Sequence, residues 1–366
     1  MAALRRWGYS MKTSVFCTTA PIGKGHGGGI VSYYECQALK EVSDLIQVVC
    51  PKSEDLGVPL ETISLNDRYS DNPFMWDYLT SLKVKHADIA FFNGAPFSST
   101  ARVVNPSKLI VDVPAHNLEL SIEEWERWQG EYPFKHMTDP FLWSLYTDFI
   151  VNADLIICPS KMSAGYVKQN PGTKGQVVVI PHGTELPDEV KPIPDEFKVG
   201  YLGATGTDKG TIYLLKAWAG LVYNDAELLL AGSGWSQNNM YDLFHKGQRV
   251  RLMGRVENVS DFYNSISVYC QPSVTESFGL PCLEAMAHGR AVIVSEGAGV
   301  SELIKDGVEG FVVPIRDAGA IADRIDWLKR RPEKVKEMGQ NARLKAESHT
   351  WSKTEAEFER LIKDES

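Results

Sequence analysis

The stretch Glu276-Ser-Phe-Gly-Leu-Pro-Cys-Leu-Glu284 decides the fold, and it follows the apolar run Val-Tyr-Cys-Gln. Pro281 lacks an amide hydrogen and has a preset φ, so it suits the first turn of a helix. We therefore expect a strand, a loop that carries Glu276, and a helix over residues 280–287 that contains Glu284. Gly289 suits the C-terminal cap of that helix.

The start of this helix has the chemistry of an anion site. The first amides of a helix have no partner within it and carry positive partial charge, so such an end binds phosphate. Glu276 and Glu284 would repel a phosphate, and are better suited to accept hydrogen bonds from sugar hydroxyls. The inferred ligand is a nucleotide sugar, with ribose, diphosphate and hexose. The alternative is an ordinary helix start with a surface glutamate. The residues Ser-Phe-Gly-Leu-Pro that follow Glu276 disfavour this alternative.

Short apolar runs alternate with helical patterns along the rest of the chain. This alternation predicts an α/β fold, with parallel sheets covered by helices on both faces. So many strands favour two sheets over one. The runs that predict strands lie at residues 13–18, 46–50, 89–93, 109–113, 155–159, 177–181, 198–203, 227–232, 250–254, 267–271, 291–295 and 310–314.

The length of 366 residues predicts two domains, and residues 187–198 have three prolines separated by charged residues, which is linker composition. We expect an N-terminal domain over residues 1–186, a C-terminal domain over residues 199–348, and a final helical segment over residues 349–366.

Composition limits the partners and the compartment. The net charge of −9 argues against broad nucleic-acid binding. No apolar run reaches the roughly 18 residues of a membrane span. The six cysteines lack CxxC spacing, which indicates free thiols in a reducing compartment, so we expect a cytoplasmic protein. Residues 125–149 are dense in aromatic side chains, which suit sugar rings or a lipid surface, although packing in the core is the favoured explanation. We expect at most peripheral contact with the inner membrane face.

Residues 276–289 resemble the donor-binding signature of the retaining GT-B glycosyltransferases of family 4, the glycogen-synthase-like and sucrose-synthase-like group. The resemblance implies a GT-B fold, in which two Rossmann-like parallel-sheet domains face a central cleft. It also implies that the last helix, from Trp351, crosses back to the N-terminal domain. Further segments that resemble the family lie at residues 27–31, 153–160, 178–183, 203–210 and 252–273.

The resemblance implies a role for each matching residue. Glu276 would touch the donor hexose, Glu284 would hold the ribose, and Lys209 would contact the diphosphate. His116 would lie beside the donor sugar, so Glu276 and His116 are the expected catalytic residues. No metal and no cofactor is expected, and the sequence contains no Asp-x-Asp. The expected donor-binding residues are Gly28, Gly29, Lys209, Val256, Ser277, Phe278, Gly279, Leu280 and Glu284.

Two of these roles have support from the residues themselves. Lys209 precedes a glycine and an amphipathic pattern, so it can place a cation beside an anion, although a lone surface lysine is the alternative. His116 follows the strand expected at residues 109–113, at the strand end where ligands of open α/β sheets gather. A histidine that merely caps a loop is the alternative there.

Two positions depart from the family pattern. The family usually has an arginine where this chain has Ala204, so the hydroxyls of Thr205 and Thr207, or a basic residue from elsewhere, would have to replace it. The family also usually has an asparagine where this chain has His182. The first departure makes a non-catalytic nucleotide-sugar-binding GT-B subunit an alternative to the enzyme, and a GT-B-fold epimerase is another.

Residues 23–28 read GxGxxG after an expected strand, which could indicate a dinucleotide site. That site needs an acid at the end of the second strand, and residues 46–50 are followed by Pro51 and Lys52 instead.

From the resemblance we expect a retaining transfer of a hexose from a nucleoside-diphosphate sugar to a hydroxyl of a sugar or lipid-linked acceptor. UDP and GDP donors stay open, because Asn258, near the expected base site, can donate or accept.

Overall fold

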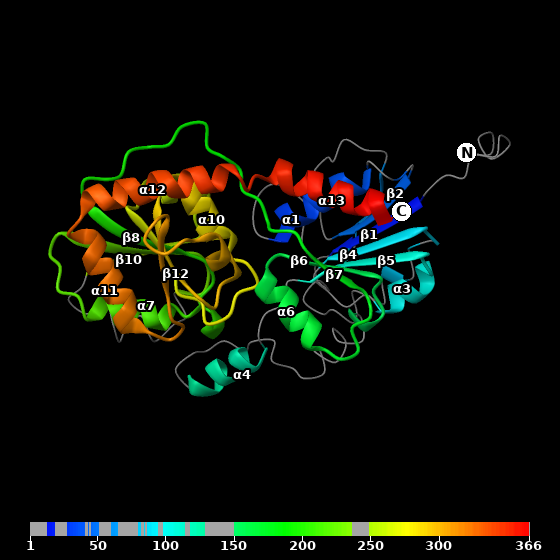
Figure 1. The fold of residues 1–366 in the computed structure, drawn as a ribbon, viewed down its shortest axis with the longest axis horizontal. Helices are drawn as coiled ribbons and strands as arrows, with labels where there is room; N and C mark the ends of the chain where they lie inside the picture. The colour runs from blue at the N-terminus through cyan, green and yellow to red at the C-terminus, as the bar shows by residue number, and fades with distance from the viewer. Residues whose placement is uncertain are drawn as a thin grey trace.

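The computed structural model describes residues 13–18, 28–40, 43, 45–50, 60–64, 80–81, 84, 86–93, 98–113, 118–128, 150–235 and 249–365. Two parallel sheets lie side by side, and helices flank each of them (Figure 1). The predicted α/β fold with two parallel sheets is confirmed. We call the first sheet and its helices the N-terminal domain, and the second sheet and its helices the C-terminal domain.

The N-terminal sheet has the strand order β3-β2-β1-β4-β5-β6-β7, and every neighbouring pair is parallel. Its central strands are buried along nearly their whole length, as parallel strands covered on both faces must be. The order reverses between β1 and β4, so a crevice opens at the carboxyl ends of these strands. The strands are β1 (Thr13–Thr18), β2 (Leu45–Cys50), β3 (Leu60–Ser64), β4 (Ile89–Asn93), β5 (Lys108–Asp112), β6 (Leu155–Cys158) and β7 (Gln176–Val179).

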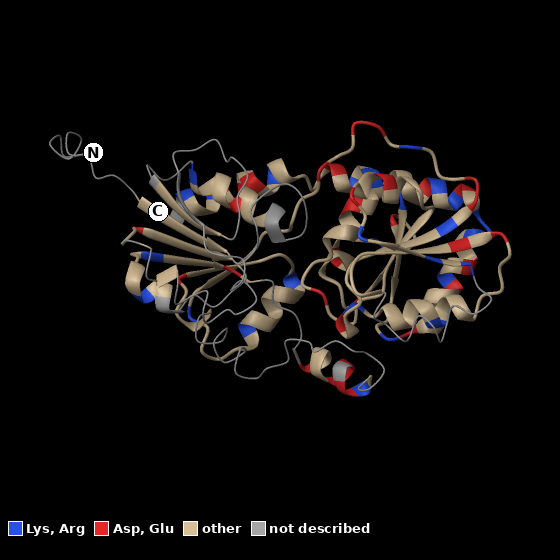
Figure 2. Cartoon of the chain, turned by 180° about the vertical axis from the view of Figure 1, so that it is seen from behind, with Lys and Arg blue, Asp and Glu red and all other residues tan. Residues whose placement is uncertain are grey.

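The C-terminal sheet has the order β10-β9-β8-β11-β12-β13, again all parallel, and it reverses between β8 and β11. Charged side chains lie mainly on the helices and connecting segments, and the interior of both sheets is largely uncharged (Figure 2). The strands are β8 (Phe197–Leu202), β9 (Ala226–Ala231), β10 (Val250–Gly254), β11 (Val268–Gln271), β12 (Ala291–Ser295) and β13 (Gly310–Val313).

Helices connect the strands in both domains, and none of the described helices is long and apolar enough to cross a bilayer. Those of the N-terminal domain are α1 (Gly28–Lys40), α3 (Ser98–Val104), α4 (Leu118–Arg127) and α6 (Lys161–Gln169). Those of the C-terminal part are η3 (Thr207–Lys209), α7 (Thr211–Ala219), α9 (Val259–Asn264), α10 (Leu280–Ala287), η5 (Gly299–Leu303), α11 (Ala318–Lys329), α12 (Pro332–Glu347) and α13 (Trp351–Glu365).

Two expectations need correction. The strand β3 was not expected, because Leu-Glu-Thr-Ile-Ser is a short edge strand with a charged residue inside it. The expected linker at residues 187–198 ends early, because Phe197 and Lys198 already pair with β9. The linker itself is anchored: the fully buried guanidinium of Arg290 donates to the carbonyl oxygen of Lys191 at 2.8 Å and of Pro192 at 3.4 Å.

Helix α13 returns from the C-terminal domain and lies along α1 (Figure 1). Its Phe358 and Ile362 are buried in the same apolar cluster as Phe16 of β1. The helix begins where the chain passes between the domains a second time, and there the amide of Thr184 donates to the carbonyl of His349 at 2.9 Å. The last residues of the chain therefore complete the core of the first domain.

Phe358→Ala should lower the free energy of unfolding by about 3–5 kcal/mol, because it removes a ring from a closed core. The loss should be measured in urea, with fluorescence and circular dichroism as probes. Lys353→Ala, on the exposed side of the same helix, is the matched control and should shift stability by less than about 0.5 kcal/mol. Equal stabilities of the two variants would contradict the docking of α13 on the N-terminal domain.

Candidate active site

The loop before α10 brings Glu276 to the carboxyl edge of the C-terminal sheet. Gly279 has a φ of 107°, which favours glycine, and it precedes the first turn of α10, which contains Pro281. The helix expected over residues 280–287 is confirmed, and Gly289 follows it with a φ of 69°. The sequence therefore predicts this strand-loop-helix unit correctly.

Lys209 and Glu276 form an ion pair beside this loop. The Nζ atom of Lys209 lies 2.6 Å from Oε2 of Glu276 and 3.5 Å from Oδ2 of Asp208. Burial by itself would lower the pKa of Lys209, but the two carboxylates outweigh it and hold this pKa above its usual range. Lys209 is therefore a permanent cation at this edge of the sheet.

The short turn that carries Lys209 depends on Gly210. This glycine has a φ of 62°, and a Cβ atom built on it would lie 2.0 Å from the carbonyl oxygen of Pro272. Only glycine fits there without displacing the segment that leads into Glu276. The backbone of the turn also holds that segment, because the amide of Val274 donates to the carbonyl of Asp208 at 2.7 Å.

A cavity of about 270 Å³ lies between the two domains, close to the roughly 300 Å³ at which small-molecule pockets begin. The C-terminal wall is the loop before α10 and the start of that helix. The N-terminal wall comes from α1 and from the carboxyl ends of β4 and β5. The lining residues are Val31, Asn93, Asp112, His182, Glu276, Ser277, Phe278, Gly279, Leu280 and Pro281.

The cavity gathers five of the predicted site residues, which are Glu276 and the four that follow it, through Leu280. Lys209 joins them through its ion pair with Glu276. Gly28 and Gly29 begin α1, whose Val31 lines the cavity. His116 lies outside the described residues. The roles given to all of these residues stay predictions.

Glu284 and Val256 lie away from the lining residues. The hydroxyl of Tyr263 donates to Oε2 of Glu284 at 2.6 Å, so α9 orients this carboxylate. Val256 packs against the apolar cluster beneath α10. Asn258 caps α9, because its Oδ1 accepts from the amide of Ser260 at 3.0 Å. Because this bond uses the side-chain oxygen of Asn258 within α9, it does not favour uracil over guanine or the reverse.

The turn at Ala204 occupies the position where the family usually has an arginine. Ala204 is exposed, and its carbonyl accepts from the hydroxyl of Tyr201 at 2.7 Å. Thr205 is buried, and its hydroxyl has no partner among the residues described. An unpaired buried hydroxyl is costly, so Thr205 is available as a ligand for an oxygen-rich group.

His182 is a site residue that the sequence marks only as a departure from the family. Its ring lies 5.1 Å from that of Phe278 and 5.9 Å from that of Trp351, measured between centroids. The side chain is 8% exposed, and its Nδ1 has no partner within the described part of the chain. Burial lowers the pKa of His182 to about 4, so the imidazole is neutral near pH 7 and can donate or accept.

Two buried acids at the N-terminal wall, Asp112 in the lining and Glu35 behind it, were also missed. The Nδ2 atom of Asn93 donates to Oε2 of Glu35 at 2.7 Å and to Oδ2 of Asp112 at 3.1 Å. Asn93 and Asp112 each end an otherwise apolar strand at the carboxyl edge of the sheet. A polar residue at the end of a buried strand was the available signal.

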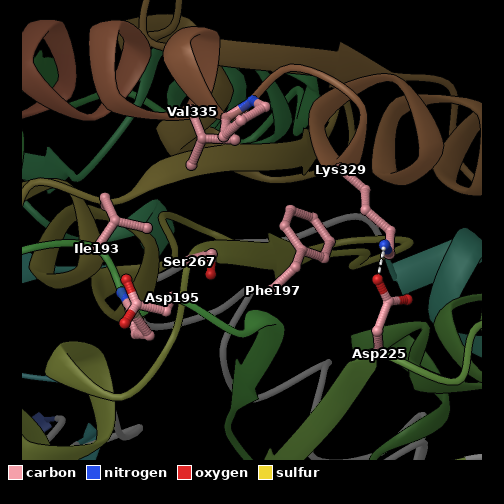
Figure 3. A pocket seen from close by; sticks show the side chains of 9 residues that line it. Ile193, Asp195, Phe197, Asp225, Ser267, Lys329 and Val335 are labelled. Atoms are coloured by element: carbon pink, nitrogen blue, oxygen red, sulfur yellow. Dashed lines mark hydrogen bonds and ion pairs between the residues drawn. The ribbon is translucent and has the colours of Figure 1, made fainter.

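A second cavity, of about 230 Å³, lies at the amino ends of β8, β9 and β11 (Figure 3). Asp225 and Lys329 form an ion pair of 2.9 Å across it, and the linker residue Asp195 also lines it. Ligands of open α/β sheets bind outside the carboxyl ends of the strands. The cavity between the domains is therefore the candidate active site.

The N-terminal domain contacts the C-terminal wall directly. The hydroxyl of Ser160 donates to the carbonyl oxygen of Ser277 at 2.8 Å. The amides of Lys161 and Met162, at the start of α6, donate to Glu302 at 3.0 Å and 2.7 Å. The two domains are therefore joined by hydrogen bonds next to the loop that carries Glu276.

The whole chain resembles solved structures in its fold. A sucrose-phosphate synthase of Thermosynechococcus elongatus superposes with a TM-score of 0.74 at 20% identity, over 96% of this chain and 98% of that one. Anabaena Alr3699/HepE in complex with UDP-glucose superposes with a TM-score of 0.69 at 17% identity, over 96% and 99%. These likenesses confirm the predicted GT-B fold.

The sequence relationship covers the C-terminal part. Residues 184–345 match the model of the family Glycosyl transferases group 1. An uncharacterized glycosyltransferase of Haemophilus influenzae is 31% identical over 160 residues, which are 42% of this chain and 45% of that protein. The chain spans about half the length of the first curated relatives that it matches.

The buried His182 should make stability depend on pH. Below its pKa of about 6.5 in the unfolded chain, the unfolded state binds a proton that the folded state takes up only near pH 4. Stability therefore falls as the pH drops through this window, by about 2 kcal/mol between pH 7 and pH 5. The measurement is urea unfolding at both pH values.

His182→Gln is the matched variant for this measurement. It keeps a polar side chain that does not titrate, and every other ionisable group is the same in both proteins. The native protein should lose about 2 kcal/mol more than the variant between pH 7 and pH 5. An equal loss would mean that His182 titrates normally and is not buried in the folded protein.

Proposed function

We propose that this protein is a retaining glycosyltransferase of family 4, which moves a hexose from a nucleoside-diphosphate sugar to an acceptor hydroxyl. The ion pair of Lys209 and Glu276, at an interdomain cavity lined by the start of α10, carries the proposal. The match of residues 184–345 to group 1 glycosyl transferases supports it. The UDP-glucose bound by Alr3699/HepE, a protein of similar fold, supports a nucleotide-sugar donor.

Different residues would bind different parts of the donor. The first amides of α10 and the cation of Lys209 would hold the diphosphate. Glu276 would accept hydrogen bonds from hexose hydroxyls, and Thr205 would donate its unpaired hydroxyl to a phosphate oxygen. Glu284, oriented by Tyr263, would hold the ribose. His116, which lies outside the described residues, is proposed to stand beside the donor sugar.

The proposed reaction takes place on one face of the sugar. The bond between the anomeric carbon and the phosphate oxygen breaks, and a bond to the acceptor oxygen forms. The proton of the acceptor hydroxyl passes to the leaving diphosphate. Fixed dipoles and Lys209 stabilise the developing charge, and the interdomain contacts exclude water. The mechanism as proposed requires no metal and no cofactor.

The acceptor class is proposed as a hydroxyl of a sugar or of a lipid-linked sugar. A cytoplasmic location, with at most peripheral contact to the inner membrane face, is also proposed. The burial of all six cysteines as free thiols supports a reducing compartment.

Binding of a nucleoside diphosphate is the first test. We expect one of UDP, GDP or ADP, present in excess EDTA, to raise the melting temperature, because a ligand of the native state stabilises it by mass action. At a concentration about 100 times the Kd the gain is roughly 2.7 kcal/mol. Inorganic phosphate at the same ionic strength is the control. The absence of any shift would contradict the donor site, and a shift that needs Mg²⁺ would contradict metal independence.

Glu276→Gln should lower turnover by about tenfold to a hundredfold while the protein stays folded. The amide has nearly the same shape but lacks the charge, and a charged hydrogen bond is worth roughly 1.5–3 kcal/mol. Release of the nucleoside diphosphate from the donor sugar is the readout. Glu296→Gln, an exposed carboxylate two residues before Ala298, is the matched control. Equal rates for the two variants would mean that Glu276 takes no part in the reaction.

The same assay separates the enzyme from its alternatives. A non-catalytic nucleotide-sugar-binding subunit, which the exposed Ala204 favours, would bind the donor and leave it intact. An epimerase would release a free sugar epimer. A glycosyltransferase hydrolyses the donor slowly and turns over faster when an acceptor is present.

A further inference from the structure

The N-terminal wall of the interdomain cavity has no part in the proposed binding of the donor. Asn93 ends β4 and Asp112 ends β5, and both line the cavity opposite Glu276. Glu35, from α1, lies directly behind them and is fully buried. Three segments of the chain therefore converge on one polar cluster inside an apolar domain.

The cluster is organised around a single amide. The Nδ2 atom of Asn93 donates to Glu35 at 2.7 Å and to Asp112 at 3.1 Å. Glu35 and Asp112 also share a hydrogen bond, which requires a proton between the two carboxyl groups. Exposure increases toward the cavity, because Asp112 is 4% exposed and Asn93 is 8% exposed.

The proton belongs mainly to Glu35. Burial, reinforced by the charge of Asp112, raises the pKa of Glu35 well above its usual range. Burial also raises the pKa of Asp112, to about 6. The hydrogen bonds from Glu35 and from the amide of Val113 act in the opposite direction and lower this pKa, but burial outweighs them. At neutral pH the cluster therefore presents the carboxylate of Asp112, held from behind by a protonated Glu35.

An independent feature of the same cavity points to a ligand. The Nδ1 atom of His182 is buried and has no partner among the described residues, and His182 lines the same cavity as Asp112. Buried polar atoms are normally satisfied, so unsatisfied ones around a cavity mark the place of a polar molecule.

We propose that Asp112 and Asn93, positioned by Glu35, form an acceptor subsite that binds an uncharged saccharide or polyol through its hydroxyl groups and rejects phosphorylated acceptors. This rests on the proposed glycosyltransferase function. A sugar hydroxyl donates to the carboxylate of Asp112 and accepts from a neutral His182. A phosphate would place a second anion beside a buried carboxylate, which is unfavourable in a site of low dielectric.

The subsite leaves the bond-forming step unchanged. Asp112 orients the acceptor by holding a hydroxyl, and the proton of the attacking hydroxyl still passes to the leaving diphosphate. Charge therefore divides the cavity into two halves. Lys209 and the start of α10 favour the anionic diphosphate on one side, and Asp112 favours neutral hydroxyls on the other.

The test starts from the nucleotide that raises the melting temperature and from its sugar donors. Release of nucleoside diphosphate is measured with pairs of acceptors that differ in one group. The pairs are methyl glucosides and mannosides against their 6-phosphates, myo-inositol against an inositol phosphate, and methyl glucosides against methyl glucosaminides. Failure of every nucleotide to bind would overturn the proposed function, whereas the acceptor results bear on the subsite alone.

We expect neutral acceptors to raise turnover at least tenfold over hydrolysis and their phosphates to fall short of them by at least tenfold. Asp112→Asn should raise the KM of the neutral acceptor about tenfold or more, while the Kd of the nucleotide changes less than twofold. Asp188→Asn, an exposed acid of the linker, is the control. The unchanged nucleotide Kd also shows that the Asp112 variant is folded.

Several results would overturn the proposal. They are equal use of a phosphorylated acceptor, a preference for the cationic amino sugar, and an unchanged acceptor KM in Asp112→Asn. A protein that hydrolyses the donor but responds to no neutral acceptor would also contradict it. If Asp112→Asn fails to fold, the proposal is decided by the native protein's comparison of each neutral acceptor with its phosphate.

The role of Glu35 has a separate readout in the pH profile. The acceptor KM of the native protein should rise as the pH falls through about 6, where Asp112 takes up a proton. Glu35→Leu removes the donor that stabilises the carboxylate, so this rise should move to higher pH. Among the described residues, the other ionisable groups that line the cavity or interact with those that do are the same in both proteins; they are His182, Glu276, its partner Lys209, and Cys158, which interacts with Asp112. An unmoved profile would make Glu35 merely structural.

Discussion

The stack of Trp351 on Tyr34 holds the two domains in the arrangement on which the site depends. The two rings are nearly parallel, with centroids 5.0 Å apart, and they join the start of α13 to α1. His182 lies next to Trp351, and Phe278 lies next to His182. Because this row of rings runs from α1 to the loop before α10, it fixes the carboxyl edges of the two sheets opposite each other. The cavity between the domains is a consequence of that geometry.

A helix that follows the N-terminal sheet in the chain packs on the C-terminal domain, away from this row of rings. The carboxylate of Glu124 in α4 is fully buried, and it accepts from the hydroxyl of Tyr213 and, at 2.7 Å, from Nε of Arg316. Helix α4 follows β5 in the chain but lies beside η3, the turn that carries Lys209. A segment that leaves the N-terminal sheet thus supports the C-terminal wall. Separation of α4 from the C-terminal domain would leave that buried charge without its partners, which is costly.

Most of the fold could be predicted from the sequence, but only half of the site could. The apolar runs gave the strands, and Pro281 with its surroundings gave α10, because both signals are local. Strand β3 lacks a comparable apolar run. Glu35, Asn93 and Asp112 stand far apart in the sequence. Asn93 and Asp112 meet because β4 and β5 are neighbours in the sheet, and Glu35 joins them because α1 packs against β1, the strand next to β4. No spacing rule connects them. His116, by contrast, was predicted from its strand, and it lies outside the described residues.

The structure of a complex with the nucleotide that binds most tightly tests the central claim most directly. We predict that the diphosphate lies within hydrogen-bonding distance of Nζ of Lys209 and of the first amides of α10, with the base toward α9 and no part of the nucleotide against Asp112. A nucleotide found instead in the cavity lined by Asp195 and Lys329, at the amino edge of the C-terminal sheet, would contradict the claim.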